Sequence, residues 1–328
     1  MKIKINKWRL AIIAIICGAI IIFFAFINSQ KKINEGMENK VETNIIVIKK
    51  EDETNELSFG EDDFSDIPNT IWAFWDGEQT ELVKKCINSW KFYNPTYKII
   101  ILNKQTYKNY ITEDIDNFKF SKDTIQRFSD YVRLCVLEKY GGIWMDASII
   151  CHKPLKWINA IQNKKKVDFI GYYINSFTEP EYLSYSPILE SWFFACAPKS
   201  IFITDWKNEF LRTNDFNTIT DYIENIKKQN ISTQNIPINL IEYLAIHCSA
   251  QLLLQQNPTK YKMILFCAEN GPFKHFEKNR DSRITADLLY NENTCREFYD
   301  YPFIKITSDI RHEVEKSNKM NNLFLDIQ

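Results

Sequence analysis

The stretch SKDTIQRFSDYVRLCVLEKYGGIWMDASIIC, from Ser121 to Cys151, combines a helical pattern, a glycine pair and a short apolar run. Apolar residues recur at helical spacing over 125–136, and Gly141-Gly142 follows where a residue with left-handed backbone is expected to end the helix. The run 143–145 is wholly apolar, as in a strand buried on both faces. Because an unpaired charge is costly to bury, we expect Asp146 at the edge of a sheet, facing a cleft.

Asp130 and Arg133 are three residues apart, so they share one face of the predicted helix. Leu134 and Leu137 lie on the same face, which is therefore not purely a solvent face. An exposed pair at this spacing stabilises a helix by about 0.2–0.5 kcal/mol. The spacing alone does not distinguish such a surface ion pair from a pair of functional residues.

The composition describes a globular chain of one or two domains. It has 328 residues, of which 45% are hydrophobic, enough for a sizeable core. A net charge of −1 argues against nucleic acid as a main partner. The 8 cysteines show no zinc-like spacing, so we expect most of them to be buried thiols, with disulfides left open.

The N-terminal part predicts a membrane anchor. Residues 1–9 are basic and form a predicted cytoplasmic tail, and residues 10–27 are free of charge, near the lower limit for a transmembrane helix. A cleaved signal peptide is the alternative, but no small-residue cleavage site follows. Residues 28–66 are polar and indicate a stem or linker, with an isolated strand at 44–48. The globular domain is expected over 67–328.

The start of that domain predicts an α/β fold. An apolar strand at 71–75, a helix at 81–92 and a second strand at 97–102 form a βαβ unit, which implies a mainly parallel sheet flanked by helices. Ligands of such sheets bind beyond the carboxyl ends of the strands. We therefore expect Trp75 and Asp146 at the same edge.

Later elements follow from the same patterns: strands at 167–173, 188–197, 262–267 and 303–306, and helices at 204–212, 219–228 and 239–256. Glu190 and Ser191 begin one of the strands and form a polar pair at its edge. His247 falls within the last helix, where a core histidine is the expected role. Lys305 and Arg311 are expected to be surface charges on the pattern alone.

An ordered set of motifs carries a family resemblance: Ile67-Pro68 with Ile71-Trp72 and Trp75, Ser89-Trp90, Asn94-Pro95-x-Tyr97, Ser129-Asp130-x-x-Arg133 and Tyr140-Gly141-Gly142-Ile143-Trp144-x-Asp146. Together they resemble the capsular-polysaccharide-synthesis type of glycosyltransferase. That group is similar to the DXD-containing mannosyl- and galactosyltransferases of family 32 and, more distantly, to the clostridial glucosylating toxins. The likeness covers about residues 67–206.

The resemblance implies a GT-A fold, a nucleotide-sugar donor, a glycan or glycoconjugate acceptor, a divalent metal (Mn²⁺ or Mg²⁺) and retention of anomeric configuration. It implies that Trp72 and Trp75 contact the donor, with Trp75 stacking on the base. Asp130 and Arg133 would hold the sugar, and Asp146 would bind the metal or the ribose. By the same resemblance, Glu190 and Ser191 match the place of polar side chains that contact the sugar or the acceptor, and Lys305 and Arg311 would contact the diphosphate. A metal at the diphosphate stabilises the charge that grows as the glycosidic bond breaks.

One motif departs from the resemblance, because Asp146-Ala147-Ser148 stands where Asp-x-Asp is usual. A serine hydroxyl is a weaker ligand than a carboxylate, although some phosphate sites use one on Mg²⁺. Asp146, Ser148 and His247 are the candidate metal ligands, with Asp309 and His312 as further candidates.

The resulting hypothesis is a hexosyltransferase held in a membrane by residues 10–27. Its N-terminus would be cytoplasmic and its catalytic domain would lie in a Golgi-like lumen, if the source is eukaryotic or viral. One alternative is a catalytically silent carbohydrate-binding protein on the same fold. A second is a metal-dependent phosphoester hydrolase that uses Asp146, which would require more metal ligands than the sequence displays.

Overall fold

The computed structural model describes residues 41–48, 65–291, 295–316 and 324. The chain divides into two units, Met1–Val41 and Glu42–Gln328, and the described fold belongs to the second. The predicted cytoplasmic tail and membrane helix (1–27) lie outside the described residues. Within the described part, no helix has both the length and the apolar character needed to cross a membrane.

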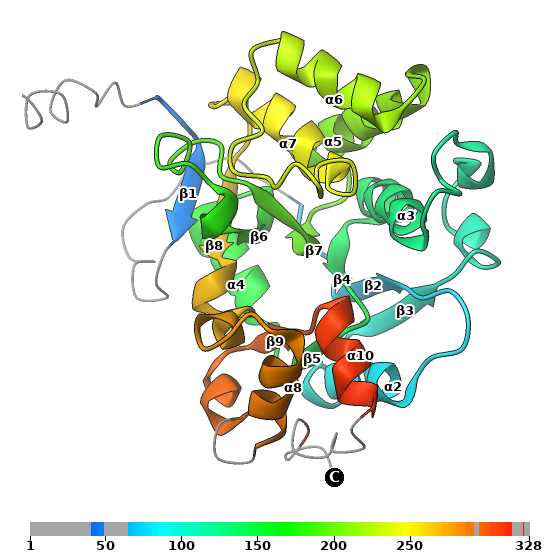
Figure 1. Ribbon diagram of the computed structural model, residues 1–328, viewed down its shortest axis with the longest axis vertical. Helices are drawn as coiled ribbons and strands as arrows, with labels where there is room; N and C mark the ends of the chain where they lie inside the picture. Colours follow the sequence, from blue (N-terminus) through cyan, green and yellow to red (C-terminus); the bar gives the residue numbers. More distant parts are fainter. Residues whose placement is uncertain (1–40, 49–64, 292–294, 317–323, 325–328) are drawn as a thin grey trace, which may run out of the picture. The chain divides into compact units, whose positions relative to one another are not determined.

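A seven-stranded sheet forms the centre of the second unit (Figure 1). Its strands, in spatial order, are β1 (Ile45–Ile48), β8 (Met263–Cys267), β6 (Phe169–Tyr173), β7 (Leu189–Cys196), β4 (Gly142–Met145), β2 (Thr70–Phe74) and β3 (Lys98–Leu102). All neighbours are parallel except β7, which is antiparallel to both β4 and β6. The first residues of β7 therefore lie at the edge where the other strands end.

Helices and a small second sheet surround this centre. The second sheet pairs β5 (Ile149–Cys151) with β9 (Phe303–Lys305) in antiparallel register. The helices are α2 (Glu81–Tyr93), α3 (Ile125–Tyr140), α4 (Trp157–Lys165), α5 (Ile201–Leu211), α6 (Ile219–Lys228), α7 (Ala245–Gln256), α8 (Ser282–Tyr290) and α10 (Ser308–Lys316). In the view of Figure 1, α5, α6 and α7 lie above the sheet, and the β5–β9 pair lies below it with α8 and α10.

Both faces of the main sheet are buried because side chains alternate along each strand. Along β2, Trp72 and Phe74 enter a core that they share with α3, α5, α6 and α7. Ile71 and Ala73 enter a second core, shared with α2 and α4. The predicted mixed α/β architecture with a mainly parallel sheet is confirmed.

Two expectations about element boundaries were wrong. The strand at 45–48 is not isolated in a linker, since it pairs with β8 at the edge of the main sheet and lies in the unit that begins at Glu42. The helix expected over 239–256 begins only at Ala245. The residues before it form irregular turns, such as Leu240 N–H to Pro237 O at 2.9 Å, which leave Ile238 and Tyr243 exposed.

The turn between α3 and β4 fixes the position of the helix on the sheet. Thr124 caps the start of α3 by accepting a hydrogen bond from the Arg127 N–H. Gly141 ends the helix with φ 61° and ψ −161°, so φ is positive as predicted, but ψ is extended and the chain enters β4 directly. Gly142 follows with φ 100°, and a Cβ there would lie 2.6 Å from the Thr70 carbonyl oxygen.

We predict that Gly142→Ala lowers the midpoint of thermal unfolding more than Gly77→Ala does. Both glycines have strongly positive φ, 100° and 94°, but only a Cβ at Gly142 meets backbone, since nothing lies within 4 Å of one at Gly77. Backbone strain alone costs about 1–3 kcal/mol, and the contact with Thr70 adds to that cost at Gly142. Equal losses in the two variants would contradict the close approach.

Candidate functional site

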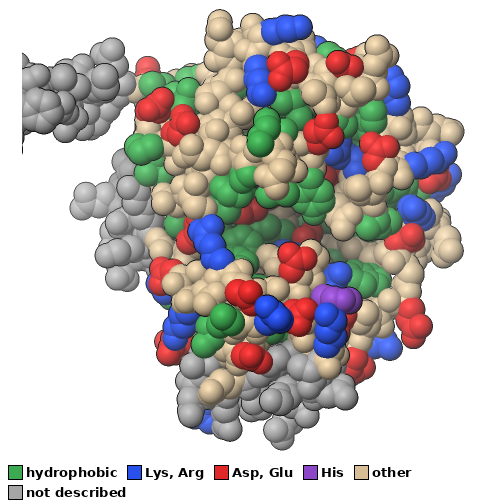
Figure 2. All heavy atoms as spheres, viewed as in Figure 1, with side chains coloured by type: hydrophobic (Ala, Val, Ile, Leu, Met, Phe, Trp, Pro, Cys, Tyr) green, Lys and Arg blue, Asp and Glu red, His purple; other side chains and the backbone are tan. Residues whose placement is uncertain are grey.

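The candidate site lies at the edge of the sheet where β2 and β4 end. Trp75 follows β2 and Asp146 follows β4, and these two strands are parallel neighbours. Glu190 joins them because β7 runs in the opposite direction and begins at this edge. Figure 2 shows a hollow near the centre of the molecular surface that faces the viewer, with hydrophobic side chains above the hollow and charged side chains below it.

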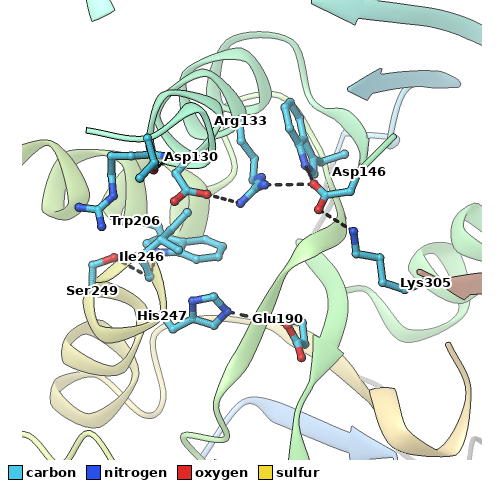
Figure 3. Close-up of polar contacts among 12 residues, drawn as sticks. Asp130, Arg133, Asp146, Glu190, Trp206, Ile246, His247, Ser249 and Lys305 are labelled. Atoms are coloured by element: carbon cyan, nitrogen blue, oxygen red, sulfur yellow. Dashed lines mark hydrogen bonds and ion pairs between the residues drawn. The ribbon is translucent and has the colours of Figure 1, made fainter. Parts of the chain in front are cut away.

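A chain of alternating charges runs through the site (Figure 3). Arg133 donates from Nη1 to Asp130 Oδ1 at 2.6 Å and from Nη2 to Asp146 Oδ1 at 3.1 Å. Lys305 Nζ lies 2.9 Å from the other Asp146 oxygen, Oδ2. The Trp144 indole N–H also donates to Asp146 Oδ1, at 3.0 Å. Sequence positions 130, 133, 146 and 305 are thus brought together.

Arg133 is a buried bridge, so the interpretation of its pair with Asp130 as a surface ion pair was wrong. Only 5% of the Arg133 side chain is exposed, and its guanidinium carbon lies 4.9 Å from the centre of the Trp144 ring. The planar guanidinium joins two carboxylates from different elements, which a lysine ammonium does with less geometric definition. Arg133 therefore fixes α3 relative to the end of β4.

The two aspartates have different electrostatic environments. Burial opposes ionisation of Asp146, but the charges of Lys305 and Arg133 outweigh it and hold the pKa of this carboxyl below its ordinary value. Burial raises the pKa of Asp130, against the opposing effect of Arg133 and Arg127. Since 29% of the Asp146 side chain is exposed against 9% for Asp130, Asp146 is the carboxylate more open to a ligand.

The residues proposed as metal ligands do not fit a divalent cation. Lys305 Nζ lies 2.9 Å from Ser148 Oγ as well as from Asp146, and Ser148 donates to the Ile306 carbonyl at 2.8 Å. Within the described residues, no group of three or more His, Cys, Asp or Glu side chains is placed to hold a metal ion. The expectation of a metal at Asp146 and Ser148 is therefore not met by this donor set.

His247 lies on α7 and faces Glu190, with Nε2 3.8 Å from Oε2 (Figure 3). No described group of three or more His, Cys, Asp or Glu side chains includes His247, and its assignment as a metal ligand stays a prediction. Ser191, next to Glu190 on β7, is half-buried. Asp309 and His312 are both exposed on α10, and neither belongs to a described metal-binding group.

Trp72 is a core residue, which corrects its assignment to the donor site. It is 3% exposed, donates to the Gly141 carbonyl at 3.0 Å and packs against the rings of Tyr110 and Tyr140. Trp75 is only partly buried, and the Arg311 guanidinium lies 4.9 Å from the centre of its ring. Trp72 is thus enclosed in the core, whereas Trp75, which follows the end of β2, keeps part of its ring exposed at the edge of the sheet.

Sequence reasoning missed two residues at the site. Arg127 is 6% exposed, its Nε and Nη1 atoms have no hydrogen-bond partner, and its charge acts on Asp130. Its spacing of three residues from Asp130 was the available signal. Tyr243 is 51% exposed, and burial of its hydroxyl together with the charges of Asp130 and Asp146 raises its pKa to about 12. No local pattern indicated Tyr243, since it lies in the irregular turns before α7.

The seven described cysteines are all buried and form no disulfide, which confirms the expectation of buried thiols. Burial raises the pKa of the Cys86 and Cys248 thiols, each to about 12. These two are therefore neutral core residues and supply no thiolate ligand.

A model of the capsular polysaccharide synthesis protein family matches residues 22–280. The chain belongs to this family. The matched range includes Asp130, Arg133 and Asp146 but ends before Lys305 and Arg311. No curated protein sequence matches the chain significantly.

Two solved structures are similar to the chain. The first is the PaToxG glycosyltransferase, with 14% identity and a TM-score of 0.38, covering 80% of this chain and 88% of that one. The second is the galactosyltransferase LgtC in complex with donor and acceptor sugar analogues, with 9% identity and a TM-score of 0.33, covering 62% of this chain and 74% of that one.

We predict that Arg133→Met destabilises the fold by about 3–5 kcal/mol, because it leaves the buried Asp130 carboxylate without its partner. Arg283→Met is the control. Arg283 is 77% exposed and 3.9 Å from Asp281, and an exposed pair contributes about 0–1 kcal/mol. Thermal unfolding of the purified protein measures both changes. Similar shifts in the two variants would show that the Arg133 bridge contributes no more than a surface pair.

Proposed function

We propose that this member of the capsular polysaccharide synthesis family is a GT-A-type glycosyltransferase. It transfers a hexose from a nucleotide-sugar donor to a glycan or glycoconjugate acceptor. The observation that carries the proposal is the convergence of Arg133, Lys305 and two aspartates at the end of parallel strands, beside Trp75. Family membership supports the same function.

The chemistry of the site suits a nucleoside diphosphate leaving group. Lys305 and Arg311 place two cations at the edge that carries Asp146 and Trp75, and cations are what a diphosphate needs. Trp75 supplies an aromatic surface for the base. Asp130 and Arg133 supply carboxylate and guanidinium groups for the hydroxyls of the sugar, and Asp146 accepts from a sugar or ribose hydroxyl.

In the reaction, the bond between C1 of the sugar and the β-phosphate oxygen breaks, and its electron pair stays on the phosphate. The acceptor hydroxyl oxygen bonds to C1, and its proton passes to the departing phosphate oxygen, which lies on the same face when configuration is retained. Glu190, whose Oε2 lies 3.8 Å from His247 Nε2, would interact with the hydroxyls of donor or acceptor. Retention itself belongs to this proposal and is tested by the anomeric NMR signal of the product.

Anchoring by residues 10–27, with the catalytic domain in a Golgi-like lumen of a eukaryotic or virus-infected cell, remains part of the proposal. The silent carbohydrate-binding alternative also remains, because Ser148 stands in place of a second aspartate. The hydrolase alternative required a larger ligand set than Asp146 alone. The described residues contain no such set.

The test is release of nucleoside diphosphate by the purified full-length chain, given a panel of nucleotide sugars and a mixture of oligosaccharide acceptors. We expect release from one donor, and a loss of about 10²–10³-fold in Asp130→Asn and in Arg133→Lys, since both disturb the buried bridge that positions Asp146. Asp114→Asn is the control, because Asp114 lies in an exposed pair with Lys108.

Transfer to an acceptor distinguishes the candidates. A new glycosidic product supports the transferase and excludes the hydrolase. Donor or glycan binding by a folded protein that gives no product with any donor would instead support the silent carbohydrate-binding alternative.

A further inference from the structure

Lys305 contacts both side chains of the Asp-Ala-Ser motif that were proposed as metal ligands. Its ammonium is 2.9 Å from Asp146 Oδ2 and 2.9 Å from Ser148 Oγ, the two side chains at the ends of the Asp-Ala-Ser motif. In an Asp-x-Asp protein these two positions carry the carboxylates. Here the second carboxylate is replaced by a hydroxyl, and a cation from the chain itself lies between the two groups.

The hydrogen-bonding capacity of the two ligands is largely used. A carboxylate has about four acceptor positions, and those of Asp146 already accept from Arg133, Trp144 and Lys305. Ser148 gives its proton to the Ile306 carbonyl and accepts from Lys305. Mg²⁺ is usually bound through one or two carboxylates together with substrate phosphates and waters. Here the motif has one carboxylate, that of Asp146, and it already contacts three donors of the chain.

The local charge also opposes a divalent cation. The two aspartates of the chain of charges, Asp130 and Asp146, are each paired with a buried cation, Arg133 or Lys305. The charges of these four residues sum to zero before any ligand binds. A divalent ion bound at Asp146 and Ser148 would also lie next to the Lys305 ammonium, which repels it.

The backbone holds Lys305 in this position. Lys305 is the last residue of β9 and pairs with Ile149 of β5, its N–H donates to the Pro272 carbonyl at 3.0 Å, and the Ile306 N–H donates to the Ser148 carbonyl at 3.0 Å. Only 10% of the Lys305 side chain is exposed. Displacement by a metal would strand a largely buried ammonium, which is costly.

We propose that Lys305 is the resident cation of the donor site, and that the chain binds and uses its nucleotide-sugar donor without a divalent metal. The inference rests on the proposed function. As the bond from C1 to the β-phosphate breaks, the electron pair and the growing negative charge stay on the phosphate oxygen, and the Lys305 ammonium stabilises that charge. Arg311, over Trp75 at the same edge, adds a second fixed cation.

Direct binding tests the inference apart from turnover. In the first experiment, Mn²⁺ is titrated into the full-length protein and the free ion is followed by electron paramagnetic resonance. In the second, each of a panel of nucleoside diphosphates is titrated into the protein by calorimetry, once in chelator and once in Mn²⁺. We expect no stoichiometric Mn²⁺ binding by the protein alone. We also expect one nucleoside diphosphate to bind with the same affinity in chelator and in Mn²⁺, and its release from the donor to survive the chelator.

Variants at Lys305 identify the group. Lys305→Met should weaken nucleoside diphosphate binding in chelator by at least about 10-fold, and Mn²⁺ should restore part of it, because Asp146 and Ser148 are then free to bind the ion. Lys305→Arg keeps the charge and should retain binding in chelator. Lys260→Met is the control. Lys260 also pairs with an aspartate, Asp205, but its side chain is 46% exposed, and it precedes β8, so it lies where the parallel strands begin and not where they end.

The outcomes separate the inference from the proposed function. Binding or release that requires Mn²⁺ in the wild-type protein would overturn the inference and leave the transferase standing. Binding of no nucleoside diphosphate, with or without Mn²⁺, would contradict both. If Lys305→Met does not fold, the wild-type titrations and Lys305→Arg still decide, because stoichiometric Mn²⁺ binding by either protein would be incompatible with a resident lysine.

Discussion

The bridge from Arg133 to Asp130 and Asp146 is the interaction on which the site depends. Asp130 is on α3 and Asp146 follows β4, and one guanidinium joins them at 2.6 and 3.1 Å. The glycine turn that ends α3 makes this possible, because positive φ at Gly141 and Gly142 lets the chain reverse within two residues. Helix, turn and strand therefore work as one unit, which presents a partly exposed carboxylate on a rigid support.

The reversed strand β7 brings a second part of the chain to this edge. In an all-parallel sheet, Glu190 at the start of β7 would lie at the far edge from Asp146. Because β7 is antiparallel to β4, the Asp146 N–H donates to the Trp192 carbonyl at 2.9 Å, and Glu190 lies just beyond. The same reversal places Glu190 beside His247 of α7. One change of strand direction thus supplies the polar groups opposite the chain of charges.

The sequence predicted what local patterns determine. The helix over Asp130 and Arg133, the strand before Asp146 and the shared edge with Trp75 follow from periodicity, the glycine stop and βαβ geometry. Trp72 was assigned wrongly because a tryptophan near the end of a strand looks the same in the sequence whether its ring faces the core or a ligand. Lys305 is 159 residues from Asp146, so its contact depends on the pairing of β5 with β9, which no local pattern encodes. The neighbour of His247 is also distant in sequence, since Glu190 reaches it only through the reversed strand β7.

A lysine and a metal ion differ in how the positive charge of a donor site is supplied. An ion exchanges with solvent, whereas the Lys305 ammonium is present only when β9 is paired with β5 and its segment is packed in place. That packing is built from a separate apolar core, in which Leu82 of α2 and Ile150 of β5 meet Ile304 and Ile310 from the C-terminal segment. The family match ends at residue 280, before this segment begins. Folding of a part of the chain outside the matched region therefore completes the charge of a candidate site whose aspartates lie inside it, and assembly of that site is coupled to packing of residues 303–316.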